Sequence, residues 1–260
     1  MTPVTPVTQR RVAVVTGGGS GIGLAVAERL TADGLAVAVF DRDAGAAAAA
    51  AERLAGAGAG AGQAAVGLAV DVTSRPQIDA GVAEVLERLG RPTVLVNSAG
   101  LEGFDRFLSI TAQQWQRILA VNLTGTFDCC QAVVPHMVEA GWGRIVNISS
   151  SAAQGGQPLM THYVAAKAGV MGFTKALALE LGPKGITVNT IPPEFIDTPM
   201  LRASERKGML GEGVAFHAAR TPVRRAGRPE DIAAACAFLV RDEAGYVTGQ
   251  VIGVNGGRRT

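Results

Sequence analysis

Short apolar runs alternate with longer segments of helical character along most of the chain. Few polar residues interrupt these runs, which indicates strands that are buried on both faces. Buried strands separated by helix-sized segments predict an α/β fold, a Rossmann-type, doubly wound parallel sheet of seven strands with helices on both faces. The predicted strands lie within residues 11–16, 36–41, 66–72, 93–100, 143–150, 185–191 and 249–257.

The chain shows no internal repeat and no linker, and its 260 residues suit one domain. We expect a flexible N-terminal tail over residues 1–10 and a single domain over residues 11–260. The Ala/Gly segment at residues 44–62 predicts a helix in its first half and a flexible turn in its second. Residues 194–220 depart from the strand and helix rhythm, which predicts a lid over a substrate site.

Composition excludes several classes of partner. The chain has 24 Lys plus Arg against 22 Asp plus Glu, so no strong field favours nucleic acid or a membrane surface. No apolar run approaches the ~20 residues that span a bilayer, and no signal peptide is apparent. The three cysteines have no metal-ligand spacing and argue against disulfides, which favours the cytoplasm.

The three histidines do not form a recognisable site either. His136, His162 and His217 are scattered, without an acid partner or a ligand spacing in the sequence, so we predict no metal site. His217 lies in the predicted lid, where it could contact a substrate. Cys129 and Cys130 fall in an apolar, helix-like stretch and are interpreted as core residues.

A glycine cluster follows the first predicted strand in "VVTGGGSGIG" at residues 14–23. A strand, a glycine loop and a helix start place backbone N–H groups and the positive end of a helix dipole together, which suits a phosphate group. The glycines stand at Gly17, Gly21 and Gly23 rather than in the common G-x-G-x-x-G spacing. In a chain with 34 glycines, a flexible turn is an equal alternative for the cluster alone.

Asp41 closes the second predicted strand about 20 residues after the glycines, where an acidic side chain binds a ribose 2′-hydroxyl. A carboxylate there repels a 2′-phosphate, which favours NAD over NADP. The neighbouring Arg42 partly offsets this repulsion. An ordinary turn residue at the end of a strand is the alternative interpretation of Asp41.

Tyr163 and Lys167 stand four residues apart in a predicted helix and therefore project from one face. An ammonium group near the phenol stabilises the phenolate, so we expect the pKa of Tyr163 to fall below its reference value of about 10. Taken alone, such a pair is usually a surface feature, and the motifs around it change that interpretation.

These motifs and their order resemble the short-chain dehydrogenase/reductase family over nearly the whole chain. The glycine loop "TGGGSGIG", "DV" at residues 71–72 and "NSAG" at residues 97–100 match family motifs, as does the C-terminal "YVTGQVIGVNGG". The family's catalytic tetrad corresponds here to Asn122 in "VNLTG", Ser150 in "NISS", and Tyr163 with Lys167 in "YVAAK". Ser150 precedes Tyr163 by thirteen residues, the spacing usual in the family.

The resemblance implies hydride transfer between a nicotinamide and a carbon bearing a hydroxyl or carbonyl group. It implies that Tyr163 is the general acid or base, that Ser150 binds the substrate oxygen, that Lys167 holds the nicotinamide ribose, and that Asn122 anchors a proton-relaying water. The implied cofactor-binding residues are Gly17, Ser20, Gly21, Ile22, Gly23, Asp41, Arg42, Asp71, Val72, Asn97, Ala99, Gly100, Tyr163, Lys167, Pro193, Ile196 and Thr198.

Two positions depart from the family pattern. Ser98 replaces the second asparagine of the family's Asn-Asn-Ala-Gly motif, which is a mild change. Glu194, in "PPEFIDTPM", stands where the family usually has glycine. If the turn there needs a positive φ, a residue with a Cβ would cost roughly 1 to 2 kcal/mol. We expect Glu194 to affect cofactor affinity or substrate range.

The sequence thus predicts one dinucleotide-binding catalytic domain. Its predicted activity is that of an NAD-dependent alcohol dehydrogenase or ketone reductase. A bulky apolar substrate, such as a steroid, terpenoid or aryl compound, is predicted from the apolar lid residues. Alternatives are a 3-oxoacyl or sugar reductase on the same scaffold, or a non-catalytic dinucleotide-binding regulator. The resemblance also implies a homotetramer or homodimer with interfaces at residues 122–140 and 163–181 and at the C-terminal strand. The lid residues are Phe195, Met200, Leu201, Met209, Leu210 and Phe216.

Overall fold

The computed structural model describes residues 10–56 and 64–260, which form a six-stranded parallel sheet in the order β3-β2-β1-β4-β5-β6. All but one residue of the predicted N-terminal tail, and the predicted flexible turn after residue 56, lie outside the described residues. The strands are β1 (Val12–Thr16), β2 (Ala36–Asp41), β3 (Ala65–Ala69), β4 (Pro92–Asn97), β5 (Gly143–Ile148) and β6 (Ile186–Ile191).

The sheet follows from strands that are apolar throughout. Every residue of β1, β5 and β6 is buried, as expected for a sheet covered on both faces. Strand β1 pairs with β2 on one side and with β4 on the other, so the winding direction reverses at β1. Ligands of doubly wound sheets bind at this reversal, outside the carboxyl ends of the strands.

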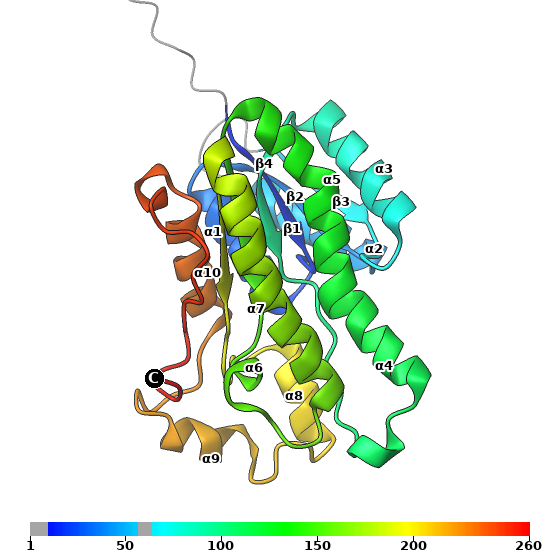
Figure 1. The fold of residues 1–260 in the computed structure, drawn as a ribbon, viewed down its shortest axis with the longest axis vertical. Coiled ribbons are helices and arrows are strands. Elements are labelled where there is room, and N and C mark those ends of the chain that lie inside the picture. Colours follow the sequence, from blue (N-terminus) through cyan, green and yellow to red (C-terminus); the bar gives the residue numbers. More distant parts are fainter. Residues whose placement is uncertain (1–9, 57–63) are drawn as a thin grey trace, which may run out of the picture.

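Helices cover both faces of the sheet (Figure 1). Helices α1 (Gly21–Ala32), α2 (Ala44–Gly56) and α10 (Pro229–Leu239) pack into one hydrophobic core. Helices α3 (Arg75–Arg88), α5 (Gly125–Ala140) and α7 (Thr161–Leu181) contribute to the second core on the opposite face. This arrangement confirms the predicted Rossmann-type, doubly wound fold.

The remaining helical elements are short, and several gather at one end of the molecule. Figure 1 shows α6 (Ala152–Gly155), α8 (Pro199–Arg206) and α9 (Gly213–Arg220) near one another at that end. Helices α8 and α9 account for most of the segment that the sequence set apart as a lid. The others are α4 (Ala112–Leu119), η1 (Phe107–Ser109), the π-helix η2 (Ala120–Thr124), η3 (Gly182–Lys184) and η4 (Asp242–Ala244).

The strand count differs from the prediction at the C-terminal segment. Residues 249–257 run beside β6 but form only isolated parallel bridges, which join Thr190 to Val251 and Pro193 to Val254. Backbone bonds from Gly249 N to Val188 O and from Ile252 N to Thr190 O still hold the segment in place. Turns and bends break the pairing into single bridges, so the described sheet has six strands rather than seven.

Ala112–Ala140 is long and apolar enough to pass as a membrane span by length and composition. In the structure it comprises α4, η2 and α5. Its apolar character has another explanation, because α5 packs against the sheet with Cys129, Cys130, Val133 and Met137 buried in the core. The stretch is therefore interpreted as a core helix. The burial of both cysteines confirms their predicted place in the core.

Candidate active site

A cleft of about 880 Å³ opens at the carboxyl ends of the strands. It is lined by residues from the glycine loop, from the ends of β4 and β5, from α7 and from the segment that contains α8 and α9. All four predicted catalytic residues, Asn122, Ser150, Tyr163 and Lys167, line it. All but one of the predicted cofactor-binding residues line it as well.

The exception is Asn97, whose side chain is buried behind the cleft. Its Nδ2 donates hydrogen bonds to Asn147 Oδ1 at 2.9 Å and to Cys130 Sγ at 3.3 Å. Asn147 Nδ2 in turn donates to Thr174 Oγ1 at 2.9 Å. These contacts join β4, β5, α5 and α7 beneath the cleft. Asn97 thus does not line the cleft, and its predicted contact with the cofactor stays a prediction.

The glycine loop needs its glycines for conformation and for space. Gly17 and Gly21 have φ values of +62° and +54°, in the left-handed region that favours glycine. A Cβ on Gly23 would collide with the carbonyl oxygen of Gly17. Helix α1 then begins with no acidic residue in its first turn, so its free N–H groups and its dipole favour an anion. This geometry favours the phosphate-binding interpretation over a flexible turn.

Asp41 at the end of β2 is bound to the same loop. One carboxylate oxygen accepts a hydrogen bond from Gly19 N at 3.0 Å, and the other accepts one from Asp43 N at 3.1 Å. The carboxylate therefore lies fixed at the rim of the cleft. Asp71 also lines the cleft. Its carboxylate accepts hydrogen bonds from the N–H and the hydroxyl of Thr73, and these bonds lower the pKa of Asp71.

A bound nicotinamide dinucleotide fits this half of the cleft. The loop offers a cradle that a Cβ would fill, a helix N-terminus for phosphate groups, and a carboxylate at the position of a ribose hydroxyl. The predicted residues that line the cleft and would hold it lie in the glycine loop and α1, at the ends of β2, β3 and β4, in α7, and in the segment after β6. The donor chemistry of the cleft is thus consistent with the family's cofactor.

Asn122 lies in the π-helix η2, where the chain passes from α4 to α5. It is fully buried. Its Nδ2 donates to Leu101 O at 2.8 Å and to Ile118 O at 3.0 Å, and its Oδ1 accepts from Leu101 N at 3.2 Å. The Cβ that Gly100 lacks would lie 3.2 Å from Asn122 Oδ1 and 3.6 Å from Lys167 Nζ. The space left by Gly100 therefore lies between these two polar side chains.

Tyr163 and Lys167 both project from α7 into the cleft, with the Lys167 Nζ 5.9 Å from the centroid of the Tyr163 ring. Lys167 is buried and donates from Nζ to Ile148 O at 2.9 Å. Ser150, which follows β5, accepts a hydrogen bond at Oγ from Ala152 N at 3.2 Å. Its hydroxyl also pairs with the phenol of Tyr163.

The pKa values differ from the sequence-based expectation. Desolvation in the cleft raises the pKa of Tyr163 to about 12, although the hydrogen bond with Ser150 acts in the opposite direction. Burial lowers the pKa of Lys167 to about 8. The predicted lowering of the phenol pKa by Lys167 is therefore wrong for the protein without cofactor, because desolvation raises the Tyr163 pKa and the Lys167 ammonium group is directed to Ile148 O.

Glu102 is a site residue that the sequence did not single out. It lines the cleft, and its carboxylate accepts a hydrogen bond from Ser204 Oγ on α8, which joins residues far apart in the chain. Burial raises the pKa of Glu102, and its negative charge raises the pKa of Tyr163. A lone glutamate in a loop carries no sequence signal of this role.

Glu194 does not have the strain that was expected of it. The left-handed residue is the next one, Phe195, with a φ of +49°. Glu194 instead accepts a hydrogen bond at Oε1 from Arg258 Nε at 3.0 Å. The Phe195 ring contacts both the Arg258 guanidinium, 4.5 Å from its ring centroid, and the His217 ring, 4.4 Å away. Pairing with the C-terminal arginine therefore accounts for the carboxylate.

Two histidines have contacts that the sequence did not reveal. His162 is buried with its Nε2 3.4 Å from Asp105 Oδ2, so it has the acid partner that the sequence did not show. His217 lines the cleft, and its Nε2 lies 3.1 Å from Leu210 O. Within residues 10–56 and 64–260, no group of three or more His, Cys, Asp or Glu side chains is placed to hold a metal ion.

Most of the predicted lid residues line the cleft. Phe195, Met200, Leu201, Met209 and Leu210 do so. Phe216 does not line the cleft; the Arg220 guanidinium lies over its ring, 5.2 Å from the centroid. The substrate side is therefore apolar in part, but Glu102, Glu194, Arg117 and Arg259 also line it.

Comparison with known proteins gives one consistent set of relatives. A family model described as enoyl-(acyl carrier protein) reductase matches residues 17–259. The short-chain reductase protein NovJ of Streptomyces niveus is 45% identical over 97% of this chain and 95% of its own length. Acetoacetyl-CoA reductase of Shinella zoogloeoides is 43% identical over 95% of this chain and 98% of its own. The crystal structure of levodione reductase aligns with a TM-score of 0.90 at 34% identity, covering 95% of this chain and 97% of that chain.

Proposed function

Because the chain belongs to the short-chain dehydrogenase/reductase family, we propose that it is an NAD-dependent ketoreductase that interconverts a ketone and a secondary alcohol. The observation that carries the proposal is the convergence of Asn122, Ser150, Tyr163 and Lys167 on the cleft beside the glycine loop. A regulator that only binds a dinucleotide has no need for these four catalytic side chains. Their convergence therefore favours an enzyme over the non-catalytic alternative.

In the proposed mechanism, the residues of the glycine loop and of α7 would hold a nicotinamide dinucleotide, which would supply or accept the hydride. Ser150 donates a hydrogen bond to the substrate oxygen and so stabilises the charge that develops on it. Tyr163, whose pKa of about 12 keeps it protonated at neutral pH, gives its proton to that oxygen during ketone reduction. The phenol is thus ready for the reductive direction before any group binds.

Lys167 and Asn122 would restore the proton of Tyr163. The pKa of Lys167, about 8, lies near physiological pH, so its ammonium group can release and regain a proton. The space left by Gly100 lies between Lys167 Nζ and Asn122 Oδ1, which supports the proposed water relay at that point. Lys167 would also bind the nicotinamide ribose, since it reaches the cleft from α7.

NAD is proposed as the cofactor in preference to NADP. Asp41 presents a fixed carboxylate at the end of β2, which would accept a hydrogen bond from a ribose 2′-hydroxyl and repel a 2′-phosphate. Arg42 lines the same part of the cleft and weakens this preference without reversing it.

The substrate is proposed to be a polar oxo compound, in the class of the 3-oxoacyl alternative, rather than a steroid. Glu102 and Arg259 bring charge to the substrate side of the cleft, which a wholly apolar steroid would leave unsolvated. The substrate named for one relative points the same way, because acetoacetyl-CoA is a 3-oxoacyl thioester.

A substrate panel tests this proposal. Oxidation of NADH and NADPH is followed with a 3-oxoacyl thioester, a 3-oxo ester, an aryl ketone, a steroid ketone and an enoyl thioester. We expect turnover of the 3-oxo compounds with NADH. Preferential turnover of the steroid would contradict the proposed substrate class. Turnover of the enoyl thioester alone would indicate an enoyl reductase, the activity in the description of the family model, in place of a ketone reductase.

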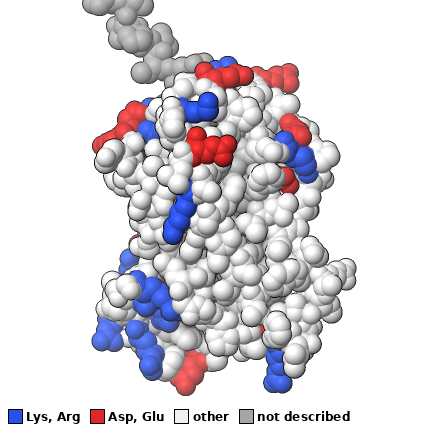
Figure 2. Space-filling view, viewed as in Figure 1, with Lys and Arg blue, Asp and Glu red and all other residues white. Residues whose placement is uncertain are grey.

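A homotetramer or homodimer in the cytoplasm is also proposed. Helices α5 and α7 carry exposed apolar side chains, with Leu179 83% and Phe127 43% exposed. Figure 2 shows a largely uncharged band across this face, with charged residues toward its two ends. Multi-angle light scattering measures the molar mass in solution, and we expect that of a dimer or a tetramer. The mass of a monomer would contradict an interface at these helices.

A further inference from the structure

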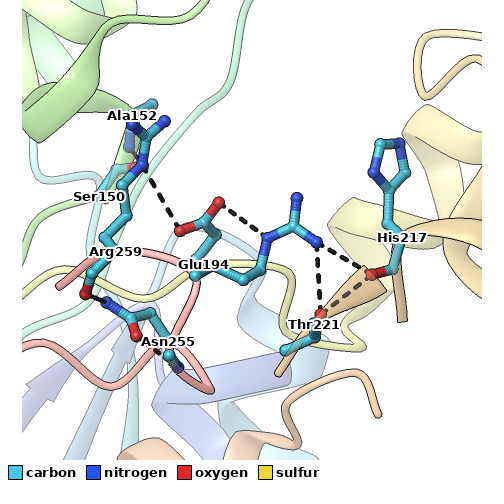
Figure 3. Close-up of polar contacts among 9 residues, drawn as sticks. Ser150, Ala152, Glu194, His217, Thr221, Asn255 and Arg259 are labelled. Atoms are coloured by element: carbon cyan, nitrogen blue, oxygen red, sulfur yellow. Dashed lines mark hydrogen bonds and ion pairs between the residues drawn. The ribbon is translucent and has the colours of Figure 1, made fainter. Parts of the chain in front are cut away.

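Arg258 and Arg259, near the end of the chain, both pair with Glu194, a residue that lines the cleft. Figure 3 shows Arg259 beside Glu194. Arg258 makes several contacts there through Nε and Nη1. Besides Glu194, its guanidinium donates to His217 O at 2.9 Å and to Thr221 Oγ1 at 3.3 Å. Arg258 therefore anchors the end of the chain to the segment that covers the substrate side.

Arg259 is held loosely by comparison. Its Nε lies 3.8 Å from Glu194 Oε2, and that oxygen accepts no hydrogen bond within the part of the chain that the structure describes. The side chain is 36% exposed and lines the cleft. Arg259 thus keeps most of its hydrogen-bond donors available to a ligand.

Its position is close to the chemistry. The guanidinium lies against Gly155 of α6, the helix that follows Ser150, and a Cβ on Gly155 would collide with it. Figure 3 shows the Arg259 side chain reaching toward Ala152 and Ser150. A substrate whose carbonyl oxygen is bound by Ser150 would therefore pass near Arg259.

The local charge favours an anion at this point. One carboxylate, Glu194, is shared by two guanidinium groups, so the cluster has a net charge of +1. The other carboxylate on the substrate side, Glu102, is bound to Ser204 on α8, a different element. An arginine with free donors binds a carboxylate with two parallel hydrogen bonds.

We propose that Arg259 is a substrate-binding residue that recognises a free carboxylate on the oxo substrate, and that Glu194 and Arg258 position the chain end that presents it. The inference rests on the proposed ketoreductase function and narrows its substrate class to oxo acids. It gives Glu194, the departure from the family's usual glycine, a role in substrate recognition.

Steady-state kinetics with NADH on matched substrate pairs would test it. The substrates are 3-oxo, 4-oxo and 5-oxo acids, each paired with its methyl ester, together with acetoacetyl-CoA. The variants are Arg259→Gln, which removes the charge, and Gly155→Ala, which displaces the guanidinium but keeps the charge. Arg91→Gln is the matched control, because Arg91 pairs with Glu139 and does not line the cleft.

For at least one acid, we expect Arg259→Gln and Gly155→Ala each to raise KM by about tenfold or more. An increase of this size corresponds to the loss of one charge-assisted hydrogen bond. The KM of its ester, and both kcat values, should stay within about twofold. Arg91→Gln should leave all constants unchanged. Melting temperatures and NADH binding would show whether each variant is folded.

Three outcomes would overturn the inference: equal effects on acid and ester, no effect on either, or an effect confined to acetoacetyl-CoA. The last would mean that Arg259 binds a phosphate of the thioester carrier. Reduction of the esters by the unmodified protein separates this inference from its premise, because it establishes ketone reduction whatever Arg259 does. If no oxo compound is reduced, the proposed function itself fails.

Discussion

The glycine loop and the Glu194 cluster lie at the same cleft, but the chain builds them differently. The loop comes from consecutive residues between β1 and α1, and its shape depends on backbone conformations that glycine adopts freely. The cluster joins Glu194 to Arg258, 64 residues away, through side chains alone. One half of the cleft is therefore set by local sequence and the other by the tertiary fold.

The two halves also differ in charge and burial. On the cofactor side, Asp41 is held by backbone N–H groups, and among the residues that the structure describes no cation pairs with its carboxylate. On the substrate side, Glu194 is 12% exposed and paired with two arginines. Substitutions on the cofactor side should thus affect every substrate equally, whereas those on the substrate side should discriminate among substrates.

Tyr163→Phe should have the largest effect, because both halves of the cleft serve this phenol. Removing a general acid typically lowers kcat by about 10²- to 10⁴-fold. Binding of NADH, measured by fluorescence, should be retained. A variant that turns over at the rate of the unmodified protein would exclude Tyr163 as the proton donor.

Gly23→Ala tests the local construction of the cofactor side. The added Cβ would collide with Gly17 O, so the loop must shift, and we expect NADH affinity to fall by about tenfold or more, equally with all substrates. Gly172→Ala in α7 is the matched control, since nothing lies near its added Cβ. It should leave affinity unchanged and raise stability slightly. Equal affinities in the two variants would contradict the role of the loop.

Asp41→Ser tests the charge on the cofactor side. Without the carboxylate, repulsion of a 2′-phosphate is removed and Arg42 becomes available to it. The ratio of kcat/KM with NADH to that with NADPH should fall by about tenfold. The measurement determines kcat/KM for NADH and for NADPH separately, with the same ketone substrate at the same concentrations. A ratio that does not move would show that Asp41 does not set the preference.

Glu102→Gln tests the coupling between the two sides and should have the smallest effect. The negative charge of Glu102 raises the pKa of Tyr163, so its removal should lower that pKa. Ketone reduction needs the protonated phenol and is lost as pH rises through this pKa. The alkaline limb of the pH profile of kcat/KM should therefore move to lower pH. A limb that moves to higher pH would contradict the assignment.

The sequence predicted the parts of the molecule that depend on local pattern. The Rossmann-type sheet followed from apolar strands. Helical spacing placed Tyr163 and Lys167 on one face, and the family resemblance added Ser150 to them at one cleft. It did not predict that Asn97 turns away from the cleft, because that depends on Asn147 and Cys130 on other elements. The roles of Glu102 and Arg259 likewise depend on contacts distant in the chain.

The prediction of a lowered Tyr163 pKa failed for a related reason. Four-residue spacing on a helix places Tyr163 and Lys167 on one face, but it does not reveal how much water the fold removes from them. In the structure, Lys167 directs its ammonium group to Ile148 O, and desolvation dominates the pKa of both groups.

The π-helical turn at Ala120–Thr124 makes the position of Asn122 sensitive to chain length. A π turn contains one residue more than the corresponding α turn, and each residue of an α-helix advances the chain by about 100°. Deleting one residue from this turn would therefore leave an ordinary α turn with α4 and α5 still in phase, but it would move the residues inside the turn, Asn122 among them, relative to Leu101. The contacts of Asn122 thus depend on the extra residue, whereas a point substitution keeps the length of the turn.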